Sequence, residues 1–134
     1  NPHIEMDRNK IKIPDNVVLI VEGNSDVRSS IDGHLKEGHP NYKVLSTADA
    51  GTALGFMAQY DISMVILDVH MPETSGLDLL IKIQNSNPWM HVVLMTQFGG
   101  EPLSRYLKDK KICILEGMNQ SIAYVFCQSF KKQF

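Results

Sequence analysis

Five short apolar runs alternate with amphipathic runs along this chain, and the alternation restricts the fold more than any other feature of the sequence. Continuous apolar runs rich in β-branched residues are typical of strands that are buried on both faces of a sheet. Strands of this kind, separated by helices, predict a parallel sheet with helices covering both faces. The strand candidates lie at 17–21, 42–47, 63–68, 91–96 and 112–115.

A helical pattern follows each strand candidate. Asn24 or Ser25 can cap the first helix with a side-chain oxygen, and Gly38 can end it. Because crossovers between parallel strands are right-handed, only a few topologies fit this order of elements. The expected helices lie at 24–38, 48–60, 75–86, 101–111 and 119–134.

The length and charge of the chain narrow the class of protein. With 134 residues, we expect one domain at 17–134, preceded by a partly disordered N-terminal extension at 1–16. A formal net charge of −2 provides no basic face for nucleic acid, and no apolar stretch approaches the length of a membrane span. Cys113 and Cys127 are expected to be small buried hydrophobes in a reducing compartment. The chain begins without Met, so we expect a fragment of a longer protein.

Polar side chains stand where four of the strand candidates end. They are Glu22, Asp68, Thr96 and Glu116, at the ends of the first, third, fourth and fifth strands. Functional groups of open parallel sheets gather at the carboxyl ends of the strands, so these four are expected to face one shallow crevice. A carboxylate such as Asp68 at the mouth of a buried strand is costly unless something uses it.

Three segments resemble the receiver domain of bacterial two-component response regulators, over about residues 17–133. "VILDVHMPETSGLDLL" is similar to the third strand of that family, with its terminal Asp, a following Met-Pro and a Gly that opens the next helix. "LIVEGNSDVRSSI" is similar to the acidic first loop and first helix, and "VVLMT" to the fourth strand with its terminal hydroxyl. The resemblance implies a flavodoxin-like doubly wound (βα)5 fold of class α/β, with five parallel strands in the order 2-1-3-4-5.

The resemblance also implies phosphorelay signalling, and not an enzyme in the usual sense. Asp68 matches the phosphoacceptor and Thr96 the switch hydroxyl that contacts the phosphoryl group, while Cys113 stands where the family often has a switch aromatic. Glu22, Asp68 and the backbone carbonyl of His70 match the ligand positions for Mg²⁺. A cation is needed there because the group transferred to the carboxylate is itself anionic.

The resemblance implies a histidine kinase or phosphotransfer protein as the upstream partner, and an effector domain or protein as the downstream partner. The expected contact surface consists of the last helix, the short helix before it and the fifth strand, and a homodimer through these elements fits as well. A cytoplasmic location is expected, without direct binding of nucleic acid or of a membrane.

Three positions depart from the family pattern. Gly23 stands where a second acid would ligate the metal, and glycine has no side chain for that role. Glu116 stands at the position of a lysine that pairs with the phosphoryl group, and Gly117 replaces the proline that follows it. A carboxylate at 116 adds a like charge, which disfavours a phosphoryl group nearby unless the side chain turns to solvent.

Two mechanisms stay open for an atypical receiver, and a third hypothesis belongs to another class. In the first, Asp68 is phosphorylated and Mg²⁺ is held weakly. In the second, which Gly23 and Glu116 favour, the domain is a pseudo-receiver that takes no phosphate and acts as an interaction module. In the third, Glu22, Asp68 and Glu116 sense a divalent ion or pH, because crowded carboxylates bind a cation or keep a proton. Taken singly, Asp68 also fits a turn residue.

Overall fold

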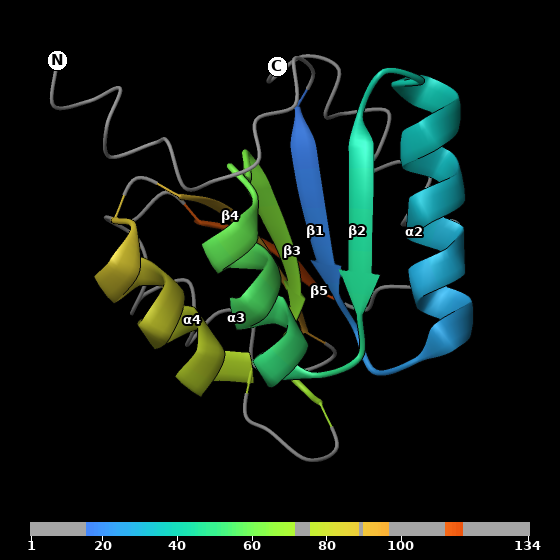
Figure 1. Ribbon diagram of the computed structural model, residues 1–134. Helices are drawn as coiled ribbons and strands as arrows, with labels where there is room; N and C mark the ends of the chain where they lie inside the picture. The colour runs from blue at the N-terminus through green and yellow to red at the C-terminus, as the bar shows by residue number, and fades with distance from the viewer. Residues whose placement is uncertain (1–15, 72–75, 89, 97–111, 117–134) are drawn as a thin grey trace, which may run out of the picture.

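A five-stranded parallel sheet forms the centre of the molecule (Figure 1). The structure is a computed structural model that describes residues 16–71, 76–88, 90–96 and 112–116, the last segment in its backbone alone. Neighbouring strands follow the order β2-β1-β3-β4-β5, which confirms the predicted doubly wound sheet. The strands are β1 (Val17–Val21), β2 (Lys43–Thr47), β3 (Met64–Asp68), β4 (His91–Thr96) and β5 (Ile112–Glu116).

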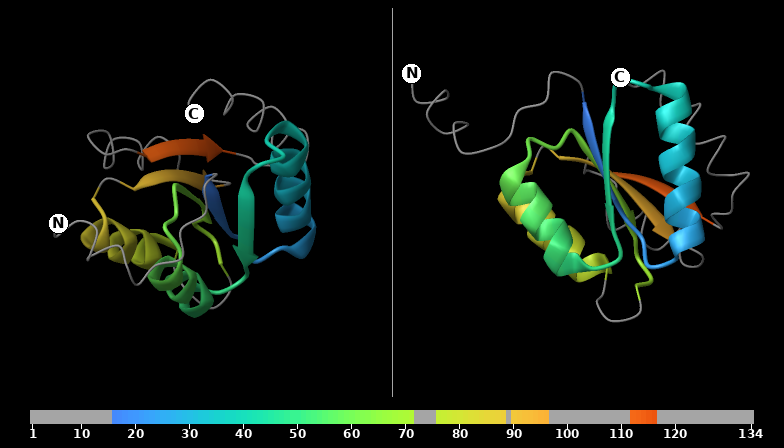
Figure 2. Two further views of the ribbon diagram at one scale, coloured as in Figure 1. Left: turned by 45° about the horizontal axis from the view of Figure 1, so that its top comes forward. Right: turned by 45° about the vertical axis from the view of Figure 1, so that its right-hand side comes forward.

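Helices cover both faces of the sheet within the described segments. They are α2 (Ser25–Gly38), α3 (Ala50–Gln59) and α4 (Gly76–Ser86). Helix α2 lies on one face, and α3 and α4 lie side by side on the other (Figures 1 and 2). The expected extension up to residue 15 and the expected helices at 101–111 and 119–134 lie outside the described residues. Within the part that is described, no helix is both long enough and apolar enough to cross a membrane.

Each face of the sheet has its own apolar core, because successive strand residues point to opposite faces. On β1, Val17, Leu19 and Val21 belong to the core under α3 and α4, whereas Val18 and Ile20 belong to the core under α2. This burial on both sides is the reason why the strands read as unbroken apolar runs. The helices contribute Ile31 and Leu35 from α2, Ala53 from α3, and Leu79, Leu80 and Ile83 from α4.

Side-chain caps begin two of the helices directly after their strands. The Asn24 side-chain oxygen accepts hydrogen bonds from the backbone N–H groups of Asp26 at 2.9 Å and Val27 at 3.2 Å. Asp49 caps α3 in the same way, with its carboxylate accepting from the backbone N–H of Thr52 at 2.7 Å. These caps satisfy donors that a helix start leaves without partners, and they fix the loops at the carboxyl edge of the sheet.

Candidate functional site

The sheet brings the predicted polar residues to one edge. Parallel registers pair Val21 with Leu67 and Asp68 with Met95, so Glu22 follows β1 beside the end of β3. Thr96 ends β4, and its register partner on β5 is Glu116. The predicted gathering of strand-end residues at the carboxyl edge is therefore correct in backbone position.

Glu22 is a buried carboxyl group that faces a second acid. The residue is only 7% exposed. Its Oε1 accepts a hydrogen bond from the backbone N–H of Asn24 at 3.0 Å. The pKa of Glu22 is raised to about 7, mainly by burial and in smaller part by Asp68, while the hydrogen bond from Asn24 and the charge of Arg28 act in the opposite direction. With its pKa raised, Glu22 keeps its proton at mildly acidic pH, in an interval where an ordinary glutamate is ionised.

The loop after β3 connects Asp68 to Thr96 through His70. The backbone N–H of His70 donates to Asp68 Oδ1 at 2.9 Å, which holds the carboxylate at the end of the strand. The His70 imidazole reaches the next strand, where Nε2 lies 3.2 Å from Thr96 Oγ1. Thr96 is 2% exposed, so this hydroxyl lies inside the edge of the sheet. Sequence reasoning assigned only the backbone carbonyl of His70 to the site and missed the contact made by its ring.

Arg28 is a member of the site that the sequence prediction missed altogether. Its Nη1 donates to the backbone carbonyl of Glu22 at 2.8 Å and lies 3.4 Å from the carbonyl of Gly23. The charge of this guanidinium lowers the pKa of Glu22, against the larger effect of burial. Its position in the first turn of α2, four residues after the Asn24 cap, is the sequence signal that points it back toward the loop.

Gly76 packs against the backbone that carries Asp68. The backbone N–H of Gly76 donates to the carbonyl of Val69 at 3.1 Å. A Cβ at residue 76 would lie 2.6 Å from Val69 Cα and would also overlap the Asp68 carbonyl. Only glycine permits this approach, which explains why a glycine opens α4 in the sequence.

The oxygen donors at this edge are of the type that binds Mg²⁺, but there are fewer carboxylates than the family pattern has. Two carboxylates, from Glu22 and Asp68, and the carbonyl of His70 are hard oxygen donors of the type that Mg²⁺ takes, with waters completing its shell. Gly23 supplies no third carboxylate. Among the described residues, no group of three or more acidic, histidine or cysteine side chains is arranged to hold a metal ion.

Of the remaining predicted positions, those on β5 are described in their backbone alone, and the others lie outside the described residues. Cys113 lies on the edge strand β5, in register with Val93 on β4. Gly117 lies outside the described residues, as does the expected surface formed by the last two helices. Whether Glu116 faces the site or solvent stays a prediction.

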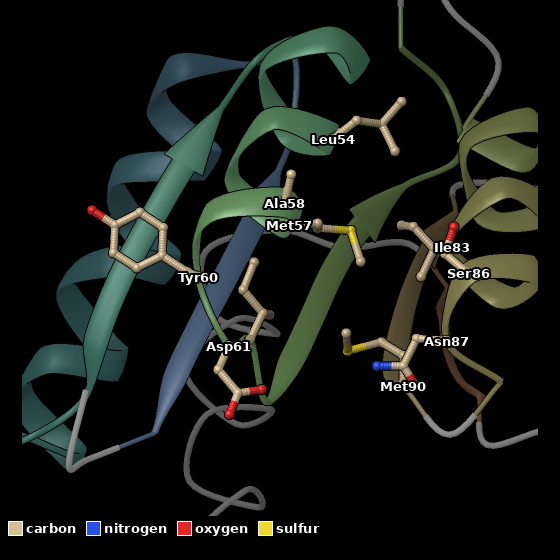
Figure 3. A pocket seen from close by; sticks show the side chains of 10 residues that line it. Leu54, Met57, Ala58, Tyr60, Asp61, Ile83, Ser86, Asn87 and Met90 are labelled. Carbon is tan, nitrogen blue, oxygen red and sulfur yellow. The ribbon is translucent and has the colours of Figure 1, made fainter. Parts of the chain in front are cut away.

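A separate pocket lies at the opposite edge of the sheet, between α3 and α4 (Figure 3). Its volume is about 300 Å³. It is near the amino ends of β3 and β4, since Ile62 and Met90 line it just before those strands begin. Its lining contains none of the predicted site residues, so this hollow is distinct from the acidic edge.

Comparison with known proteins places the chain among signalling sequences. Residues 18–116 match the family model described as response regulator receiver domain. A glycerol metabolism activator from Pseudomonas putida is 32% identical over 80 residues, which are 59% of this chain and 36% of that protein. The response regulator protein FleR from Pseudomonas aeruginosa is 35% identical over 82 residues, 61% of this chain and 17% of that protein. A sensor histidine kinase from Ectopseudomonas mendocina is 35% identical over 78 residues, 58% of this chain and 8% of the kinase.

The chain thus spans 36% or less of the length of these three relatives. Solved structures match over most of the chain. A CheY-like response regulator receiver domain protein from Methanospirillum hungatei has a TM-score of 0.73 at 20% identity, covering 89% of this chain and 93% of its own. The Mn²⁺-bound form of the response regulator Rcp1 has a TM-score of 0.72 at 19% identity, covering 87% and 92%. At these identities the likeness concerns the fold.

Proposed function

Since the chain belongs to the response regulator receiver domain family of two-component systems, we propose that it accepts a phosphoryl group on Asp68 as an atypical receiver. A histidine kinase or phosphotransfer protein is the donor, and the phosphorylated domain acts on an effector domain or protein through a surface contact. The similarity of this chain to a short part of a sensor histidine kinase is in keeping with a place in phosphorelay signalling.

The observation that carries this proposal is the setting of Asp68. Its carboxylate stands at the carboxyl end of β3, its Oδ1 accepts the N–H of His70 at 2.9 Å, and Thr96 ends the adjacent strand. Glu22, which follows the neighbouring strand β1, has a raised pKa because it is buried. Asp68 is less buried than Glu22, which suits a group that meets an external donor.

Each residue of the site has its own role in the proposed phosphoryl transfer. An oxygen of Asp68 forms the new bond to phosphorus, and the His70 N–H keeps the carboxylate in place. Thr96 offers a hydroxyl to a phosphoryl oxygen, once it exchanges its contact with the His70 ring for that bond. Glu22, Asp68 and the His70 carbonyl would hold Mg²⁺, which supplies positive charge against the anionic phosphoryl group.

Incubation with acetyl phosphate and Mg²⁺, followed by intact-mass measurement, tests the proposal. We expect the added mass of one phosphoryl group on the unaltered protein and none on Asp68→Asn. A receiver known to label is treated in parallel, so that an inactive phosphodonor is recognised. No added mass on this protein beside a labelled control would overturn phosphorylation by this route and leave the interaction-module hypothesis.

A second function is favoured by one observation, the burial of the Glu22 carboxyl group next to Asp68. We infer that a carboxyl group with a pKa of about 7 lets the domain respond to a pH change near neutrality. A carboxyl-carbon NMR titration tests this directly. A Glu22 signal that titrates near 7 supports the pH response, whereas titration near the ordinary value of 4.5 contradicts it.

A further inference from the structure

The acidic edge lacks a cation at the position where the receiver family has a lysine. The β5 residue in register with Thr96 is Glu116. A phosphoryl group on Asp68 would carry about two negative charges near neutral pH in place of the single charge of the carboxylate, beside Glu22, and a positive partner stabilises such a group. The described part of the chain contains one cation with recorded bonds to this edge, and that cation is Arg28.

We propose that Arg28 binds the phosphoryl oxygens on Asp68 and so takes the role that the family gives to the lysine at position 116. This inference rests on the proposed function. It assigns a phosphoryl-binding role to a residue of the first helix, on the opposite side of Asp68 from β5.

The position of Arg28 is set by the strand that neighbours the phosphoacceptor. Its guanidinium is bound to the carbonyl of Glu22, and Glu22 follows the β1 residue whose register partner is Leu67, directly before Asp68. Neighbouring strands lie about 4.8 Å apart. The guanidinium is therefore anchored on the loop that follows β1, the strand next to the one that ends in Asp68, and its charge acts on the Glu22 carboxyl group.

The chemistry of the guanidinium suits this role. Both recorded bonds of Arg28 at this edge use Nη1. A guanidinium carries five N–H donors in a rigid fork, so it can keep the loop carbonyls and face a phosphoryl group at the same time. Arg28 is half-buried, which strengthens its attraction for an anion relative to a cation in bulk water.

Gly23 contributes to the same arrangement through its missing side chain. Residue 23 carries no carboxylate, and Arg28 Nη1 lies 3.4 Å from its backbone carbonyl. A carboxylate that reached the guanidinium from this loop would compete with a phosphoryl group for the cation. Gly23 and Glu116, which both depart from the family pattern, are thus compatible with one relocated positive charge.

Phosphoryl transfer to Asp68 consumes no reactant other than the phosphodonor. With acetyl phosphate as donor, an oxygen of Asp68 forms a bond to phosphorus as the bond from phosphorus to the acetate oxygen breaks. Acetate leaves with the electron pair, and no proton or electron is exchanged. Arg28 stabilises the charge on the three phosphoryl oxygens that are not reacting.

Phosphoryl uptake from acetyl phosphate, followed by intact mass over time, tests the inference on the whole chain. We expect Arg28→Gln to label at least about tenfold more slowly than the unaltered protein, and Arg28→Lys to keep part of the rate. Lys36→Gln is the matched control, because it removes an equal charge from the exposed last turn of the same helix. It should label like the unaltered protein.

A charge-relocation variant separates binding of the phosphoryl group from a structural role in the loop. The double variant Arg28→Gln with Glu116→Lys should regain labelling if Arg28 supplies positive charge, whereas a lost loop anchor would not be repaired from the fifth strand. Thermal unfolding of each variant shows whether the fold is retained. Equal labelling of Arg28→Gln and the unaltered protein, or no regain in the folded double variant, overturns the inference. Absence of labelling in the unaltered protein overturns the proposed function, and this inference with it.

Discussion

The imidazole Nε2 of His70 lies 3.2 Å from the hydroxyl oxygen of Thr96, although the two residues are 26 positions apart in the chain. The contact joins the loop after β3 to the end of β4. It holds the hydroxyl in the state of the domain that carries no phosphoryl group. A phosphoryl group on Asp68 would therefore compete with His70 for Thr96.

A double-mutant cycle measures this contact. His70→Ala and Thr96→Val should each lower the free energy of unfolding, and the coupling between them should be about 0.5–1.5 kcal/mol, as for a partly buried hydrogen bond. Urea unfolding of the four proteins provides the values. Coupling within error of zero would show that the hydroxyl does not depend on the imidazole.

The raised pKa of Glu22 predicts that the free energy of unfolding decreases as the pH rises toward neutral. Its pKa is raised in the folded protein from 4.5 to about 7. The folded state therefore binds more protons than the unfolded state in this interval, and the stabilisation is complete below about 4.5 and lost as the pH rises through about 7. The loss is on the order of 2–3 kcal/mol.

Glu22→Gln removes this titration while keeping the shape of the neutral acid. Urea unfolding between pH 5 and 8 should show a flatter profile for this variant, with its advantage over the unaltered protein largest at the alkaline end. Asp26→Asn, which removes an exposed acid from the first turn of α2, serves as the control for the change in net charge. A Glu22→Gln profile parallel to that of the unaltered protein would contradict the raised pKa.

Gly76→Ala should damage the site through the backbone. The added Cβ would lie 2.6 Å from Val69 Cα, so either α4 or the Asp68–Val69 peptide must move. We expect a loss of about 1–3 kcal/mol in the free energy of unfolding, together with slower phosphoryl uptake. Gly33→Ala and Gly55→Ala are matched controls inside α2 and α3, where a Cβ meets nothing within 4 Å. Each control should gain about 0.5–1 kcal/mol from helix propensity, and a similar gain at residue 76 would refute the close packing.

Helix α4 contains a matched pair of isoleucines for testing the core. Ile83 is 0% exposed under the sheet, whereas Ile81 is 49% exposed on the same helix. Ile83→Ala should lower the free energy of unfolding by about 2–5 kcal/mol, and Ile81→Ala should change it by less than about 0.5 kcal/mol. Thermal or urea unfolding decides the matter, and equal losses at the two positions would mean that the assigned helix face is incorrect.

Gly23→Asp should strengthen binding of a divalent cation. The substitution adds a carboxylate to a set that holds only Glu22, Asp68 and the His70 carbonyl, and Mg²⁺ affinity is expected to rise roughly tenfold. Calorimetric titration with Mg²⁺ measures the change. Gly33→Asp, which adds the same charge on an open surface of α2, separates a ligand effect from a general change in net charge. If both variants bind alike, residue 23 is not a ligand position.

The backbone arrangement of this domain was predictable because burial leaves a direct record in the sequence. Strands buried on both faces must be unbroken apolar runs, and parallel connections then bring Glu22, Asp68 and Thr96 to one edge. The cap of α2 was predicted down to the choice between Asn24 and its neighbour. Such features depend on residue type and spacing alone.

The contacts of Arg28 and the His70 ring were not predictable in the same way. Each depends on where a long or ring-bearing side chain turns, and on loop backbone that supplies the partner. The raised pKa of Glu22 is a further case, because burial of Glu22 depends on the packing of the whole edge. Sequence spacing indicates that such residues are near, and only geometry shows which of them bond.

The glycine at residue 76 has a mechanical consequence. Because α4 starts directly on the peptide of Asp68 and Val69, with one hydrogen bond and no side chain between them, helix and reactive strand end form a stiff joint. A displacement of that peptide on the scale of a bond length cannot be absorbed by side-chain rotation. It is passed directly to the backbone at the start of α4, and we expect the helix to move together with the peptide.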